Sequence, residues 1–386
     1  MRNSLTLRLL LLTYGLMVQL PCPAQERTAT KDDRRMVLNP DKSRHYISNK
    51  ISGIVESVAE GKSDNQNADR EPFDLIRVRQ AAERGDAKAQ YSLGVAYFKG
   101  KGVQKDYTEA AKWSLKAAEQ GNTKAQYNLG VACFHGDGVK KNYSEGVNWF
   151  RKAAGNNNVK AQYYLGIAYS HGRGVKRSET EAVKWFQKAA EQGHAEAQFK
   201  MGNAYYNGQE VEQNYTEAVK WYHQAAVQGD ATAQFNIGLA YMHGRGVGKN
   251  EEEAAKWFRL AAEQGDVDAQ SNLGNAYYTG QGVVQNYTEA VKWFQKAAEQ
   301  GDAKAQYNLG IACDGGHGMV KNYSEAVKWY RQAAKQGLAE AQFNLGACYI
   351  NGEGVEKNQK EAMNWLRRAA DQGHKSAIEA LRKIRK

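Results

Sequence analysis

Three histidines recur at a fixed spacing, and recurring histidines are candidate metal ligands. His135, His171 and His243 are separated by 36 and 72 residues. The ligand nitrogens of one zinc site must all lie about 2 Å from the same ion, whereas equivalent residues of successive repeats lie much farther apart. The sequence therefore predicts no metal site, and nothing in it calls for a cofactor.

The cysteines and serines form no catalytic pattern either. Cys133, Cys313 and Cys348 are an odd number without short pairing spacings, so we interpret them as buried small apolar residues and not as a disulfide framework. No serine is followed by a lysine three residues later, and no Gly-x-Ser-x-Gly occurs. The sequence predicts no catalytic residue, and we expect the protein not to be an enzyme.

The elements that position all these residues repeat with a period of 36. The chain of 386 residues has eight tryptophans, each 36 residues from the next: Trp113, Trp149, Trp185, Trp221, Trp257, Trp293, Trp329 and Trp365. Eight units without insertion or deletion cover residues 81–368. A fixed period in this range is typical of a solenoid, in which each unit buries an apolar face of its neighbour.

Each unit is predicted to contain two helices. The first, over residues 86–98 in the first unit, ends at Gly100, and the second begins with the capping box Asp106-Tyr-Thr-Glu109 and ends at Gly121. We interpret Asn142, Asn214, Asn286 and Asn322, which head glycosylation sequons, as helix caps. Every first helix has a central glycine, which predicts that a second helix passes close by, with the tryptophan opposite: Gly94, Gly130, Gly166, Gly202, Gly238, Gly274, Gly310 and Gly346.

The repeated motif AAEQG-x-x-x-AQ-Y-x-LG-x-x-Y-x-x-G-x-GV-x-x-NY-x-EAVKW resembles the Sel-one-like repeat, a relative of the tetratricopeptide repeat. The resemblance covers about three quarters of the chain. It implies an all-α fold, a right-handed α-solenoid of eight tandem 36-residue helix-turn-helix repeats, that serves as a scaffold or adaptor for protein partners. Two departures, Glu210 and Asn157 in place of turn glycines, predict two loops of different shape.

The ends of the chain differ from the repeats. Residues 1–24 have Arg2 and Arg8, a leucine-rich run and small residues before a cleavage point, which predicts a cleaved signal peptide and a periplasmic or secreted protein; an uncleaved anchor is the alternative. Residues 25–70 are predicted to be a flexible leader, 71–83 an N-terminal capping helix and 369–386 a C-terminal capping helix. No transmembrane segment is predicted in the mature chain.

We predict no nucleic-acid partner, although the net charge is positive. It is +11 for the whole chain and falls to +9 when Arg2 and Arg8 leave with the signal. Many lysines lie near acidic residues or close a second helix, so we interpret most of them as solvated or paired. The remaining positive charge could attract the protein to an anionic envelope surface, which is a possible second partner. An exported chain has no reason to meet nucleic acid.

The candidate binding surface is one face of the first helices, expected to be exposed and concave. One column on this face carries five asparagines, whose amides could bind the backbone of an extended peptide, although asparagine is also an ordinary surface residue. The column and the apolar side chains expected beside it are Asn128, Tyr164, Lys200, Asn236, Asn272, Asn308 and Asn344, with Phe134, Ile167, Tyr206 and Tyr278.

These observations together predict an exported scaffold that binds a protein or peptide in the groove of the repeat array. The alternative is a cell-envelope hydrolase or glycan-binding protein carried on the same repeats, which would need a convergent acid, base or nucleophile cluster. A third interpretation is a structural spacer, with the face masked.

Overall fold

The computed structural model describes residues 74–384, where every regular element is an α-helix. The signal peptide and the leader predicted over residues 1–70 lie outside this range. The helices are α3 (Leu75–Glu83), α4 (Ala87–Lys99), α5 (Tyr107–Glu119), α6 (Thr123–His135), α7 (Tyr143–Gly155), α8 (Val159–His171), α9 (Glu179–Glu191), α10 (Ala195–Asn207), α11 (Tyr215–Val227), α12 (Ala231–His243), α13 (Glu251–Glu263), α14 (Val267–Thr279), α15 (Tyr287–Glu299), α16 (Ala303–Gly315), α17 (Tyr323–Lys335), α18 (Ala339–Asn351), α19 (Gln359–Asp371) and α20 (Lys375–Ile384).

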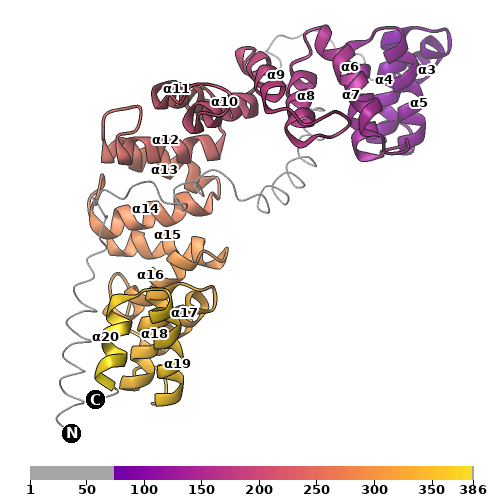
Figure 1. The fold of residues 1–386 in the computed structure, drawn as a ribbon. Helices are drawn as coiled ribbons and strands as arrows, with labels where there is room; N and C mark the ends of the chain where they lie inside the picture. Colours follow the sequence, from indigo (N-terminus) through magenta and orange to yellow (C-terminus); the bar gives the residue numbers. More distant parts are fainter. Residues whose placement is uncertain (1–73, 385–386) are drawn as a thin grey trace. The chain divides into compact units, whose positions relative to one another are not determined.

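Helices α4 to α19 form eight pairs, from α4–α5 to α18–α19, with α3 before them and α20 after them (Figure 1). The two helices of a pair pack on each other. The described chain divides into two compact units, residues 74–192 and 193–384. Within each unit, the second helix of one pair also packs on the first helix of the next, which is the architecture of an all-α solenoid.

Caps explain why the helices begin and end where they do. The Asn142 side chain accepts a hydrogen bond from the backbone N–H of Glu145, and the same cap begins α11, α15 and α17. This confirms that these asparagines cap helices. Each first helix ends at a glycine in the left-handed conformation, as Gly100 does with a φ of 70°.

The two loops expected to differ keep the backbone conformation of the others. Asn157 has a φ of 58° and Glu210 a φ of 59°, values in the left-handed region that the equivalent glycines occupy. The prediction of altered loops is therefore wrong, because the surrounding turn imposes its conformation on a residue that disfavours it.

The central glycine of each first helix lies against the second helix of its pair, as predicted, but the residue that it meets is not the tryptophan. A Cβ atom on Gly130 would lie 2.5 Å from Cε1 of Phe150, which follows Trp149. The same contact recurs with the residue after each tryptophan, which is Phe186, Tyr222, Phe258, Phe294, Tyr330 and Leu366 in the later pairs. Burying such a ring removes about 150–250 Å² from water, which contributes about 4–6 kcal/mol gross.

Seven of the eight tryptophans lie half-buried beside this core, Trp149 is buried, and cations cover several of them. The ammonium of Lys152 lies 4.1 Å from the ring centre of Trp149, and that of Lys296 lies 4.0 Å from Trp293. Other lysines pair with a glutamate one turn earlier, as Lys112 does with Glu109 at 2.7 Å. The structure thus accounts for much of the basic charge of the second helices through local contacts.

Buried glutamines join the turns of each pair. Gln90, in α4, donates its amide to the Ala82 carbonyl and accepts from Gln120 at 2.7 Å. Seven of the eight pairs have this Gln–Gln bond. The pair α6–α7 lacks it, because Asn156 is one methylene shorter than glutamine, and the buried Oε1 of Gln126 has no partner.

We predict that Gly130→Ala destabilises the protein and that Gly155→Ala does not. The new methyl group of the first variant would collide with Phe150, which costs about 1–3 kcal/mol. Gly155, also helical, has no neighbour within 4 Å of an added Cβ, so alanine there should stabilise by up to about 1 kcal/mol. Urea midpoints followed by circular dichroism test both, and equal shifts would contradict the close packing.

We also predict that Asn156→Gln stabilises the protein by about 1 kcal/mol, because it supplies the donor that the buried Gln126 oxygen lacks. Thermal unfolding of the full-length protein measures the gain. The reverse change, Gln120→Asn, is the matched control and should lower the midpoint by a similar amount. A midpoint unchanged by Asn156→Gln would show that the missing bond costs nothing.

Candidate interaction surface

The face predicted to bind a partner consists of the second, sixth, ninth and thirteenth residues of each first helix, with the twelfth residue beside them. In α6 these are Lys124, Asn128, Val131 and His135, with Phe134 beside them. We call it the first-helix face. These positions are one helical turn apart and share one side of the helix. In most pairs the sixth, ninth and twelfth side chains are half-buried, whereas the second and thirteenth are mostly exposed. The middle of this face is therefore less exposed than the sequence suggests.

Three asparagines of the first-helix face lie near tyrosine hydroxyls of the chain itself. Asn128 lowers the pKa of Tyr91, Asn236 that of Tyr222, and Asn344 that of Tyr307, each against the larger rise that burial causes. The amides that we expected to be exposed therefore lie beside buried side chains.

The remaining two asparagines are also engaged. Asn308 is only 5% exposed and donates to Asn275 Oδ1 at 2.9 Å, and Asn272 donates to the Asp268 carbonyl. The expectation of exposure is therefore wrong for Asn308. Partner binding by the column stays a prediction.

The apolar residues predicted on this face differ in how they are placed. Phe134 is buried against Phe150, with ring centres 5.0 Å apart, so it belongs to the core and not to the surface. Ile167, Tyr206 and Tyr278 are half-buried. The hydroxyl of Tyr206 accepts a hydrogen bond from Arg245 at 2.6 Å, and that of Tyr278 lies 2.6 Å from His317 Nδ1.

Lys200 stands on the same column with its side chain half-buried. Burial lowers the pKa of its ammonium, and the nearby Asp230 carboxylate partly opposes this shift. The first-helix face is therefore varied in charge as well as in size.

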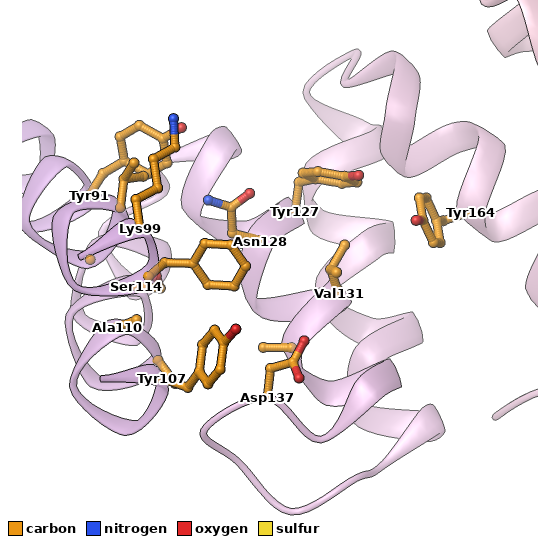
Figure 2. A pocket seen from close by; sticks show the side chains of 15 residues that line it. Tyr91, Lys99, Tyr107, Ala110, Ser114, Tyr127, Asn128, Val131, Asp137 and Tyr164 are labelled. Atoms are coloured by element: carbon orange, nitrogen blue, oxygen red, sulfur yellow. The ribbon is translucent and has the colours of Figure 1, made fainter. Parts of the chain in front are cut away.

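Asn128 and Tyr164 come together at a cavity of about 90 Å³ within residues 74–192. Figure 2 shows side chains converging on it from α4, α5, α6 and α8 and from Asp137 in the loop after α6. The wall is mostly apolar, and the complete lining is Tyr91, Gly94, Val95, Phe98, Lys99, Tyr107, Ala110, Ala111, Ser114, Tyr127, Asn128, Val131, Ala132, Asp137 and Tyr164.

Ser114, which forms part of this cavity, was not among the residues predicted from the sequence. The signal was present, because Ser114 follows Trp113 where the other seven pairs carry a phenylalanine, a tyrosine or a leucine. The sequence does not show that this position matters. In the structure, the residue after the tryptophan, and not the tryptophan itself, lies against the central glycine.

Residues 74–384 contain no group of three or more histidine, cysteine, aspartate or glutamate side chains placed to hold a metal ion. Over the same residues, no helix combines the length and the apolar character that crossing a membrane requires. Cys133, Cys313 and Cys348 are buried free thiols, and burial raises the pKa of Cys133 to about 11. Such thiols are poor nucleophiles at neutral pH.

One residue of the first-helix face, Asp314, should make stability depend on pH. Burial, and then the Glu353 carboxylate, raises the pKa of Asp314 above 3.8. The folded chain therefore holds this proton more tightly than the unfolded chain. The stability that Asp314 contributes is fully present below pH 3.8 and is lost as the pH rises through the raised pKa.

We predict that Asp314→Asn raises the urea midpoint at pH 7 and that the gain shrinks near pH 3.8. Asparagine keeps an acceptor for the Tyr330 hydroxyl, which lies 3.5 Å from Asp314 Oδ2. Glu356→Gln, on an exposed residue nearby in sequence, is the control for removing one negative charge. The same gain at both pH values would contradict the raised pKa.

Comparison with known proteins places this architecture in a family. The family model of the Sel1 repeat matches eight consecutive segments, residues 87–122, 123–158, 159–194, 195–230, 231–266, 267–302, 303–338 and 339–374. No protein with a curated description matches significantly.

Two solved structures resemble the chain along most of its length. A protective antigen of uropathogenic Escherichia coli strains, with an SLR fold, is 41% identical with a TM-score of 0.75; the match covers 79% of this chain and 66% of that one, slightly under two thirds. A Sel1 repeat protein from Oxalobacter formigenes is 31% identical with a TM-score of 0.58, over 84% of this chain and 98% of that one. The chain therefore belongs to the Sel1 repeat family, whose repeats generally serve as protein-interaction scaffolds.

Proposed function

We propose that this protein is an exported scaffold that binds a protein or peptide partner on the first-helix face, without chemistry. The observation that carries the proposal is the cavity on this face, where Asn128 and Tyr164 meet. Apolar walls with a few polar groups at the edge are typical of sites that bind other molecules.

Export is part of the proposal because it decides where the partner is. The signal-like residues 1–24 support it. The similar protein of Escherichia coli is described as a protective antigen, and we take this description to favour export. The partner would then be an envelope or extracellular protein.

Photo-crosslinking from the first-helix face tests the proposal. A benzophenone amino acid replaces Lys99, an exposed residue at the edge of the cavity, in the full-length protein expressed in its native cell. We expect one recurring partner protein, crosslinked through one contiguous segment.

N-terminal sequencing of the recovered protein tests cleavage of the predicted signal. The sequence should begin near Gln25, and a start at Met1 would contradict cleavage.

The matched control places the same amino acid at Val284, which is 88% exposed and lies in the loop after α14. It should not give the same adduct. Equal adducts from both positions, or none from Lys99, would show that the first-helix face is not where a partner binds.

A further inference from the structure

The first helix pair lacks the aromatic ring around which the other pairs are built. In the other seven pairs, the residue after the tryptophan is phenylalanine four times, tyrosine twice and leucine once, and each lies against the central glycine of the first helix. In the first pair this residue is Ser114, whose Oγ would lie 2.9 Å from a Cβ on Gly94. The backbone of α5 thus keeps its close approach to α4 although the large side chain is missing.

The cavity is the place that this ring would occupy. In the second pair, Phe150 packs on Phe134 at 5.0 Å, on Tyr164 at 5.1 Å and on Tyr127 at 6.1 Å between ring centres. The residues 36 positions earlier are Phe98, Asn128 and Tyr91, and all three line the cavity. The first pair therefore has the walls of an aromatic site without its aromatic residue.

The apolar character and the open side of the cavity suit one aromatic ring. Its volume of about 90 Å³ is smaller than the closed apolar cavity of about 150 Å³ that binds benzene, but this cavity opens to solvent, so an entering ring does not have to be enclosed completely. A ring can enter from outside because two lining residues, Lys99 and Tyr107, are exposed. Val95 and Val131 supply apolar walls, and the rings of Tyr91 and Phe98 can pack against an entering ring.

The edge of the cavity suits a side chain that arrives on a peptide. Asp137, Lys99 and the amide of Asn128 provide acceptors and donors around an apolar centre. Polar groups at the edge can bind the backbone that carries the ring, while the ring itself leaves water. A lone Phe or Tyr anchored in a pocket is the usual centre of such a contact.

We propose that this cavity binds one phenylalanine or tyrosine side chain of an extended segment of the partner protein. The incoming ring takes the position that Phe150 and its counterparts fill from within the other pairs. This inference rests on the proposed function, because it names the group by which the partner is held. It assigns the anchoring contact to the first helix pair, and to Ser114 as the residue that leaves the space open.

The first experiment asks whether the cavity accepts a ring at all. Fluorobenzene is titrated into the full-length protein and followed by ¹⁹F NMR. Ser114→Phe fills the cavity from within and should weaken binding at least about tenfold, the loss expected when an apolar pocket is blocked, while raising the thermal midpoint. Leu260→Phe adds the same ring at a position 45% exposed, on α13, and should leave binding unchanged.

A second filling variant protects the test against misfolding. Ser114→Leu introduces the residue that the last pair carries as Leu366, and it should also weaken binding. Fluorobenzene binding that persists in both folded variants, or no binding to the unchanged protein, would overturn the inference.

The second experiment asks whether the cavity selects a partner residue. A random peptide library is selected on the unchanged protein, on Ser114→Phe and on Leu260→Phe. We expect peptides selected by the unchanged protein and by Leu260→Phe to share phenylalanine or tyrosine at one position, and this preference to disappear with Ser114→Phe.

The outcomes separate the two proposals. The same aromatic preference with Ser114→Phe, or peptides without any such preference, would overturn the inference while leaving partner binding in place. A failure to select any peptide, together with no specific crosslink from Lys99, would overturn the proposed function as well.

Discussion

The contact between the central glycine of one helix and the ring on the next is the constraint on which the repeat depends. A glycine in a helix interior costs about 1 kcal/mol relative to alanine. The ring of Phe150 or Phe294 becomes fully buried because no Cβ keeps the two backbones apart. The gain from burial exceeds the cost of the glycine, so every pair keeps the same short separation.

The same constraint explains how one substitution creates a cavity and not a collapsed pair. Ser114 removes the ring, yet α4 and α5 are still held by other contacts. The backbone N–H of Asp106, just before α5, donates to the Tyr97 carbonyl of α4, and Gln120 bonds to Gln90 at the other end of α5. Because these contacts fix both helices, the space between them stays open, and a change within one repeat becomes a candidate site on the first-helix face.

Polar side chains in a repeated column are not by themselves evidence of a binding surface. The buried glutamines such as Gln90 hold the turns of each pair together, and the asparagines at positions such as Asn344 lie near buried tyrosine hydroxyls. Both columns look alike in the sequence, since amides are common on surfaces and in satisfied interiors. Only the positions of their partners distinguish a structural amide from an available one.

The sequence by itself determined the helices, their caps and the number of repeats, because these depend on contacts a few residues apart and on a strict 36-residue period. It also placed Asn128 and Tyr164 on one helix face, and both line the same cavity. It misplaced the tryptophans, the exposure of Asn308 and the role of Phe134, and it gave Ser114 no meaning. The tertiary structure decided these points, because burial and cavities depend on which side chains pack against each other across helices. A sequence period sets the positions of residues along the chain but does not determine these contacts.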